Sequence, residues 1–352
     1  MLRRQNNTGQ STGSHRGAGG APVSVTTATV QQGDIGVYLD AIGTVTPVYT
    51  SSITSQVNGM VMDVHYTEGQ LVHKGDPLID IDPRPYQATL LEAEGTLDHD
   101  KGLLAQAQMD LTRYQAAWAR NAIPRQTLDD QAKLVQQYEG TIKNDQGTVQ
   151  YDQVQVGFCH ITAPITGRVG LRLVDPGNVV QAGAATTLAV ITQIRPITVI
   201  FTIPEDSLGE LLPRLHQKTK LRVDVYDRSD LHKIATGTLL TLDNQIDTTT
   251  GTVKARADFA NSDSDLFPNE FVNTRLLVNT LRGVALIPSA AVQHNGEAAF
   301  VYVLQNKVAH IRNITVGVTE GGISQVQGIE PGAGVATSSF NRLEDKTPWG
   351  CP

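Results

Sequence analysis

The sequence has little that would mark a membrane-spanning, disulfide-stapled or nucleic-acid-binding protein. No apolar run reaches the roughly 18 residues that a membrane-spanning helix needs. There are two cysteines, Cys159 and Cys351, too few for a disulfide framework or a cysteine-cluster zinc site. Lys and Arg number 28 against 35 Asp and Glu, and the net charge of −7 argues against a mainly phosphate-binding surface. These three classes are therefore excluded first.

Signatures of catalysis are also missing. The chain has no G-x-S-x-G, H-E-x-x-H, P-loop or dinucleotide-binding fingerprint. His65 and His73 lie eight residues apart, but such a pair without further ligands is typical of an ordinary surface. We therefore predict no enzyme, and no catalytic, cofactor-binding or metal-binding residues.

What the chain does contain is length and turns. Its 352 residues, with 32 Gly and 16 Pro, suffice for two or three domains. Residues 1–22 are polar and rich in glycine, which predicts a flexible tether. This segment has no apolar core of a signal peptide, so either an export signal was removed or the protein is cytosolic. Residues 344–352 lose all periodicity and are expected to be a frayed tail.

Two distant segments repeat one pattern. SQVNGMV with EGQLVHKGD, from residue 55, matches APITGRV with PGNVVQAGA, from residue 163. Three glycine pairs share one offset of 108 residues: Gly59 with Gly167, Gly69 with Gly177, and Gly75 with Gly183. Shared glycines at shared spacing indicate that the backbone makes the same turns twice. Each copy is too small to bury its own face, so residues 46–82 and 157–195 should pair with each other.

The insertion between the copies, residues 83–156, changes to a seven-residue period. One arm carries Leu90, Leu97, Leu104, Leu111 and Trp118, and the other Leu128, Val135, Ile142, Val149 and Val156. Two such stripes joined across residues 121–124 predict an antiparallel coiled-coil hairpin. On the second arm, the other row of the seven-residue repeat that would face the first arm is polar. The apolar seam between the helices should therefore be narrow.

A row of small residues lies away from this seam. It includes Gly95 and Gly102 on the first arm and Gly140 and Gly147 on the second. Glycine costs about 1 kcal/mol relative to alanine in an exposed helix interior. One interpretation is that hairpins pack side by side in a ring along this row; the alternative is a solvated face that tolerates glycine.

The remaining sequence alternates at strand period. Residues 196–281 predict a small β-barrel, with turns expected at Asp243-Asn244 and Thr250-Gly251, and residues 282–343 a further β module. Residues 23–45 would supply the first strands of both. The fold class expected is mainly β with an antiparallel helical hairpin, in an elongated chain of several modules.

The two repeated segments resemble the half-motifs of a biotinyl/lipoyl domain. The order half-lipoyl, helical hairpin, half-lipoyl, barrel, β module resembles periplasmic adaptors, or membrane fusion proteins, especially those of RND multidrug efflux pumps. The match is strongest in the barrel, at Leu242-Asp243-Asn244, Asp247, Thr250-Gly251-Thr252, Arg256-Ala257, Phe259, Asn261 and Leu266-Phe267-Pro268. Asn269 departs from the glycine usual there.

The resemblance implies a non-catalytic adaptor in the periplasm, tethered to the inner membrane. It would form a homo-oligomeric ring, commonly of six copies, between an inner-membrane RND transporter and an outer-membrane TolC-like channel. The barrel and final β module, which would be membrane-proximal, would dock on the transporter.

The same resemblance places channel contacts at the hairpin tip. The family has Arg, then Leu four residues on and Ser seven later; Arg113 matches, but Ala117 and Pro124 stand at the other two positions. Trp118 and Ile123 would supply the apolar contact that Ala117 does not, and Arg120 completes the expected tip. An ordinary solvated arginine remains the alternative for Arg113.

Two other functions stay open. Within the adaptor class, the alternative is that the partner is an ABC exporter and not an RND transporter. From another class, the chain would be a lipoyl- or biotinyl-type carrier, although Lys74 does not lie at a hairpin tip joining the two halves, as a carrier requires.

Overall fold

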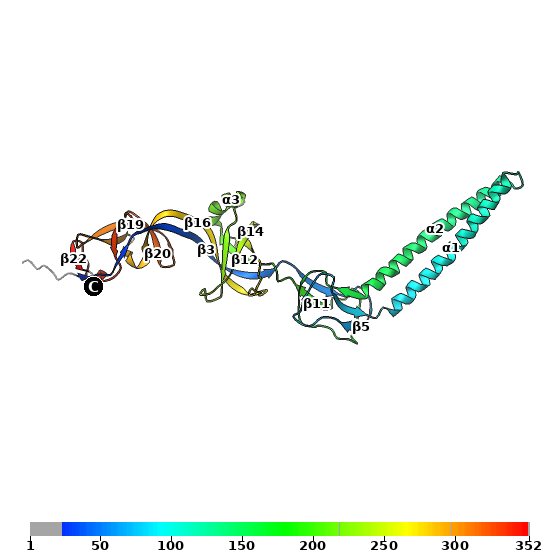
Figure 1. Ribbon diagram of the computed structural model, residues 1–352, viewed down its shortest axis with the longest axis horizontal. Helices are drawn as coiled ribbons and strands as arrows, with labels where there is room; N and C mark the ends of the chain where they lie inside the picture. Colours follow the sequence, from blue (N-terminus) through cyan, green and yellow to red (C-terminus); the bar gives the residue numbers. More distant parts are fainter. Residues whose placement is uncertain (1–22, 218, 297, 351–352) are drawn as a thin grey trace, which may run out of the picture. The chain divides into compact units, whose positions relative to one another are not determined.

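The computed structural model describes residues 23–217, 219–296 and 298–350, so the expected tether, residues 1–22, lies outside the described residues. The chain is mostly β, with two long helices forming a hairpin (Figure 1). It divides into two compact units. One comprises residues 41–205 and 223–274; the other comprises the described residues up to 40, residues 206–222 and those from 275 onward. The fold class predicted from sequence, mainly β with a helical hairpin, is confirmed.

The repeated segments form two four-stranded sheets in the first unit. The first copy supplies β4 (Thr50–Thr54), β5 (Gly59–Val64), β6 (Leu71–Val72) and β7 (Pro77–Ile81). The second supplies β8 (His160–Thr162), β9 (Gly167–Val169), β10 (Val179–Val180) and β11 (Thr187–Thr192). The strand orders are β10-β5-β7-β8 and β4-β11-β9-β6.

These two sheets are related by the repeat itself. Replacing each strand by its counterpart in the other copy turns one strand order into the other. Both sheets contain strands of both copies, with antiparallel pairs such as β10–β5 and β6–β9. The predicted pairing of the copies is confirmed. Neither copy completes a sheet alone, since each sheet takes its two inner strands from one half and its two outer strands from the other.

Equivalent glycines have the same structural role in both copies. Gly69, Gly75, Gly177 and Gly183 all have positive φ, between 71° and 95°, a conformation that other residues rarely adopt. Gly59 and Gly167 are required for space instead. A Cβ on Gly59 would lie 2.6 Å from Ile81 Cγ2, and one on Gly167 would lie 2.5 Å from the Thr192 carbonyl oxygen.

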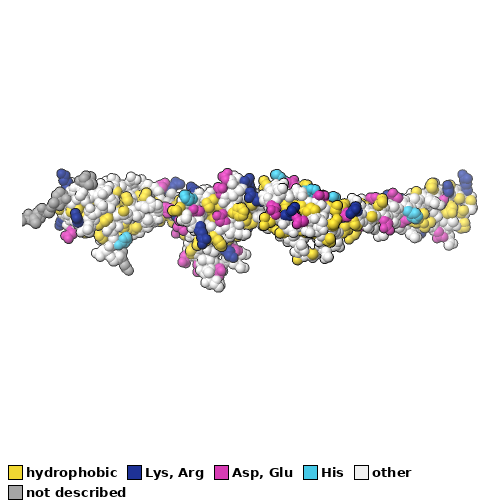
Figure 2. Space-filling view, turned by 90° about the horizontal axis from the view of Figure 1, so that it is seen from below, with side chains coloured by type: hydrophobic (Ala, Val, Ile, Leu, Met, Phe, Trp, Pro, Cys, Tyr) yellow, Lys and Arg dark blue, Asp and Glu magenta, His cyan; other side chains and the backbone are white. Residues whose placement is uncertain are grey.

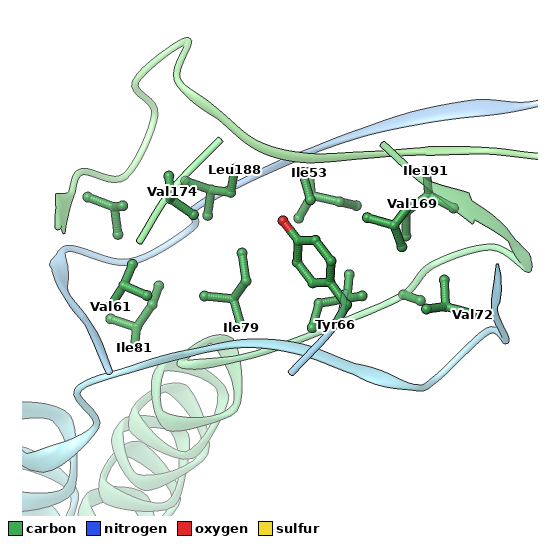
Figure 3. Close-up of a cluster of buried hydrophobic side chains, with 14 of the residues drawn as sticks. Ile53, Val61, Tyr66, Val72, Ile79, Ile81, Val169, Val174, Leu188 and Ile191 are labelled. Carbon is green, nitrogen blue, oxygen red and sulfur yellow. The ribbon is translucent and has the colours of Figure 1, made fainter. Parts of the chain in front are cut away.

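Between the two sheets lies an apolar core drawn from both copies (Figure 3). Val61 and Val169, which are equivalent in the repeat, are both buried in it. The Tyr66 ring lies in the middle of the labelled cluster and is 6 % exposed. Because side chains from both halves are buried in this core, the pairing of the copies is stabilised by the hydrophobic effect as well as by hydrogen bonds between strands.

The hairpin consists of α1 (Arg84–Trp118) and α2 (Arg125–Phe158). It leaves the sheet from β7 and returns into β8, and these strands pair antiparallel, with Asp80 opposite His160. The helices therefore start and end on neighbouring strands. At 1.5 Å per residue each arm is about 50 Å long. Figure 1 shows them side by side, and their buried residues include Leu97 and Val149.

The barrel strands of the same unit are β12 (Ile197–Pro204), β13 (Arg222–Tyr226), β14 (Lys233–Asp247) and β15 (Thr252–Phe259). They are joined by residues 41–47 of β3 (Gln31–Pro47) and the start of β16 (Phe271–Pro288). Thr250-Gly251 makes the predicted turn, with Gly251 at φ 62°. The turn predicted at Asp243-Asn244 is wrong, because the β14–β15 register shifts between Leu242 and Ile246 and β14 continues through these residues as a bulge.

The second unit is also built mainly of strands. It contains the rest of β3 and β16, with the short helix α3 (Leu208–His216). Its other strands are β1 (Val23–Ser24), β2 (Thr27–Thr29), β17 (Gln293–Asn295), β18 (Ala298–Gln305), β19 (Val308–Glu320), β20 (Ile323–Gln327), β21 (Gly334–Ala336) and β22 (Thr347–Gly350). None of the helices in the described residues has the length and hydropathy of a membrane span.

The expectation that residues 344–352 fray is wrong for the described part of that segment. Residues 347–350 form β22, which pairs parallel with β1, Val23 opposite Trp349, and antiparallel with β19. Trp349 also packs against a buried cluster that includes Val25 and Leu343. The order of this segment comes from remote partners, which four residues without periodicity cannot reveal.

The repeat predicts that Gly167→Ala destabilises the split domain. Its Cβ would meet backbone, which cannot move aside as a side chain can, so we expect a loss on the order of 1–3 kcal/mol in the free energy of unfolding. Urea denaturation followed by circular dichroism measures it. Gly170→Ala is the matched control, because its Cβ would lie 3.6 Å from the Val190 carbonyl oxygen. Equal stability of the two variants would contradict the assigned role of Gly167.

Candidate functional site

The hairpin tip is a short turn with a defined helix end. Asn121 lies at φ 58°, its N–H donates to the Trp118 carbonyl at 2.8 Å, and the Ala122 N–H donates to the Ala117 carbonyl at 3.0 Å. This pair of bonds is a Schellman motif, which satisfies the last carbonyls of α1. Pro124, at ψ 148°, then precedes α2. The tip backbone is therefore held by local bonds, leaving its side chains available to a partner.

The structure places all six predicted tip residues in or near this turn. Arg113, Trp118, Arg120 and Pro124 are exposed, whereas Ala117 and Ile123 are half-buried. Trp118 is 45 % exposed, so the seven-residue stripe that predicted it does not hold it in the seam. A straight helix drifts against a seven-residue repeat, and by the end of α1 the half-buried positions are Tyr114 and Ala117.

The tip also carries positive charge, and Figure 2 shows Lys and Arg side chains gathered at its right-hand end, which is the hairpin tip. The Arg113 guanidinium contacts the Asp110 carboxylate at 2.9 Å, one helical turn back. Arg125 lies 3.6 Å from Asp129 on α2. Both arginine side chains remain at least 74 % exposed, so these intrahelical pairs do not hide them.

The predicted side-packing row is accessible. Gly95, Gly102, Gly140 and Gly147 are all exposed, and a Cβ on any of them would meet no heavy atom within 4 Å. Nothing within the described chain requires glycine there, unlike the crowded Gly59 and Gly167. The smallness of this row is therefore not explained by the hairpin's own packing.

The seam is narrow and partly polar, as its sequence indicates. Gln131 crosses it, donating from Nε2 to the Ala107 carbonyl at 3.0 Å. Asp152 is only 7 % exposed, and its Oδ2, like that of Asp145, is buried without a hydrogen-bond partner. Burying a carboxylate costs free energy, whereas burying an apolar side chain at the same position in the seam would not.

One carboxyl pair in the seam is electrostatically strained. Burial raises the pKa of Asp145, and the neighbouring carboxyl of Asp100, on the other helix, raises that pKa further. Asp100 in turn contacts His99 Nδ1 at 2.7 Å. Two carboxylates facing each other across the seam repel when both are ionised, and this repulsion adds to burial in raising the pKa of Asp145.

At the hairpin base, the structure joins residues that the sequence did not single out together. Asp80 on β7 contacts His65 Nε2 at 2.6 Å and His160 Nδ1 at 2.8 Å. Burial would raise the pKa of Asp80, but the hydrogen bonds from His160 and His65 outweigh it and lower that pKa. His160 begins β8, directly after α2, so this cluster ties the returning strand to β7. The sequence does not predict this cluster, because 80 residues separate Asp80 from His160.

The first turn of α1 is fixed by a second acidic residue. Asp82 accepts hydrogen bonds from the Arg84 backbone N–H and guanidinium, and this arginine lowers the pKa of Asp82 to about 2. The carboxylate is therefore ionised at neutral pH. These contacts link the residue after β7 to the first turn of α1.

Candidate ligand and carrier sites give little further chemistry. His73 lies 3.7 Å from Asp76, and no group of three or more His, Cys, Asp or Glu among the described residues is arranged to hold a metal ion. Lys74 lies in the turn between β6 and β7, whose strands belong to different sheets, and its N–H donates to Thr166 Oγ1. It is therefore not at the tip of a hairpin of paired strands.

Comparison with protein families identifies two of the modules. Residues 49–192 match the family model "RND MFP, barrel-sandwich hybrid domain", and residues 196–280 match "RND MFPs, beta-barrel domain". The multidrug resistance protein MdtA of Pectobacterium carotovorum subsp. carotovorum (strain PC1) is 43% identical over 92% of this chain and 79% of its own length. MdtA of Pantoea ananatis (strain AJ13355) is 42% identical over 96% and 83%.

Solved structures show the same fold at lower identity. A MacA–MexA chimera containing the α-hairpin domain of Pseudomonas aeruginosa MexA has a TM-score of 0.56 at 22% identity, covering 86% of this chain and 96% of that one. MacA from Actinobacillus actinomycetemcomitans has a TM-score of 0.54 at 20% identity, covering 89% and 99%.

The strained seam predicts a pH dependence. Because the folded-state pKa of Asp145 is raised, the folded hairpin binds a proton more tightly than the unfolded chain, so stability rises as pH falls through that folded pKa. Asp145→Asn should stabilise the protein at neutral pH and flatten this rise. Thermal unfolding between pH 4 and about 8, monitored by helical circular dichroism, measures both effects.

Asp130→Asn is the control for this measurement, since Asp130 is an exposed residue of the same helix. The opposite contribution of Asp80, whose stabilisation is lost as pH falls, is present in both variants and cancels in their difference. If Asp145→Asn and Asp130→Asn follow the same pH profile, the carboxyl pair does not strain the seam.

Proposed function

Because this chain belongs to the RND membrane fusion proteins, a family of periplasmic adaptors, we propose that it links an inner-membrane RND transporter to an outer-membrane TolC-like channel for drug efflux. It acts in the periplasm, tethered to the inner membrane, as a homo-oligomeric ring of about six copies. Its relatives bear the name multidrug resistance protein, which supports drugs as the cargo. The role is one of assembly and is not catalytic.

The observation that carries this proposal is the hairpin. Two helices of about 50 Å project from neighbouring strands and end in a tip whose backbone bonds are satisfied locally. Apart from the narrow seam between its two helices, a hairpin of this length encloses no hydrophobic core. Such a projection suits a protein that must reach a partner away from its own β modules.

The exposed side chains of the tip are the proposed channel contacts. Trp118 offers a large apolar surface, and aromatic side chains are frequent anchors of protein interfaces. Arg113 and Arg120 present exposed guanidinium groups that suit carbonyls or carboxylates of a partner. Ala117, Ile123 and Pro124 are the other tip residues proposed to contact the channel. The barrel and the membrane-proximal β module are the parts proposed to dock on the transporter.

The glycine row is the proposed contact between neighbouring hairpins of the ring. Gly95 and Gly102 on α1, with Gly140 and Gly147 on α2, let a second helix surface approach closely because they present no side chain. Helix surfaces with small residues pack at short interaxial distance. This accounts for a feature that the isolated hairpin leaves unexplained.

Trp118→Ser should greatly reduce capture of the outer-membrane channel, because it removes the apolar anchor, while capture of the inner-membrane transporter should be unaffected. Affinity purification of the tagged, membrane-tethered protein with both partners measures this. Tyr151→Ser is the control: Tyr151 is 64 % exposed and lies near the base of α2. Loss of both partners, or of neither, would contradict tip docking. Recovery of an ABC exporter in place of an RND transporter would move the chain to that class of adaptor.

The double variant Gly95→Leu, Gly102→Leu should block ring assembly without unfolding the protomer, because two bulky side chains then occupy the proposed contact. Sedimentation velocity of the purified protein together with its transporter gives the oligomer mass, and circular dichroism reports the helix content. Gln108→Leu with Gln115→Leu is the matched control, two exposed residues at the same seven-residue spacing on another face of α1. An unchanged oligomer mass in the glycine variant would refute side-by-side packing.

A further inference from the structure

A cavity of about 400 Å³ lies in the first unit, beside the end of β9. One wall is formed by Arg168, Val169 and the following residues up to Leu171, and the opposite wall by the loop of residues 264–269. Its volume lies in the range of small-ligand sites. None of the residues described above as tip, glycine row or hairpin base contributes to it.

The loop that forms the second wall is held rigidly. Asn261, only 8 % exposed and at φ 51°, donates from Nδ2 to the carbonyls of Ile194 and Leu266 and accepts from the Leu266 N–H. Arg195 Nη2 donates to Ser264 Oγ at 2.7 Å. These bonds tie the loop to the segment that follows β11. The cavity is therefore a preformed feature between two anchored walls.

The walls are mainly apolar, and their largest side chains are unusually accessible. Phe267 is 61 % exposed and Leu171 is 73 % exposed, although both line the cavity. Exposed phenylalanine and leucine side chains facing a common hollow lose contact with water when an apolar molecule occupies it. The walls thus favour a ligand with a hydrophobic body.

The charge of the cavity is equally selective. Arg168 is the only residue with a formal charge among those that line it, and no carboxylate lines it. The Arg168 Nε is buried without a hydrogen-bond partner. An unpaired guanidinium in a mostly apolar hollow favours an anionic group, since a charge-assisted hydrogen bond there forms in a low-dielectric setting. Ser264 and Thr192 add hydroxyl groups for orientation.

We propose that this cavity is a binding site for a small amphipathic organic anion, whose hydrophobic body packs on Phe267 and Leu171 and whose anionic group pairs with Arg168. This goes beyond the proposed function, because bridging a transporter and a channel requires no ligand on the adaptor. A neutral or cationic amphiphile would leave the Arg168 guanidinium unpaired and bind less tightly.

Two naphthalene probes that differ in charge test the proposal. The anionic probe is 8-anilinonaphthalene-1-sulfonate and the neutral one is N-phenyl-1-naphthylamine, which lacks the sulfonate. Fluorescence titration of the full chain should show one saturable site that prefers the anion. Arg168→Gln should weaken anion binding about tenfold, the effect of losing one hydrogen bond to a charged group, with neutral-probe affinity unchanged within about twofold.

Phe267→Ala should weaken both probes, and because Phe267 is exposed this variant keeps the proposal testable if Arg168→Gln fails to fold. Arg172→Gln is the matched control, an arginine close to β9 that pairs with Asp175 and does not line the cavity. Three outcomes would overturn the proposal: no saturable site, equal loss of anion binding in Arg168→Gln and Arg172→Gln, or loss of the site on self-association of the chain. The last would assign the hollow to a protein interface.

Discussion

Exchange of strands between the two halves of the split domain is the constraint on which the rest depends. Neither half can complete a sheet alone, and the buried core draws on side chains of both. The halves must therefore meet although some 75 residues separate them, and everything between them must leave and return at one place. That place is the β7–β8 pair, strengthened by Asp80 between His65 and His160. The hairpin projects because its two ends are held together.

Much of this architecture could be predicted from the sequence, since it depends on local or periodic signals. The glycines at one offset required the same turns twice, and the structure shows why: positive φ at Gly69 and Gly177, and crowding at Gly59 and Gly167. The seven-residue period gave the two helices nearly to their ends. It failed at Trp118, where accumulated drift turns the stripe out of the seam.

The features that could not be predicted depend on partners remote in sequence. β22 is ordered by β1 and β19, which no pattern within four residues encodes. The bulge at Asp243-Asn244 has the residues of a turn, and only the pairing with β15 keeps the strand going. Of the site, the tip could be located from the hairpin pattern, whereas the Asp80 cluster and the cavity at Arg168 arise from tertiary packing alone.

The β7–β8 anchorage makes the length of the hairpin an independent variable. Adding or removing seven residues in each arm preserves the seam and moves the tip by about 10 Å, without altering a strand pair of the split domain. Reach and platform can thus evolve separately: one heptad per arm changes the distance that is spanned, while the sheets below keep their register. The hairpin is in this sense an insertion of variable length in a β domain whose strand pairing stays constant.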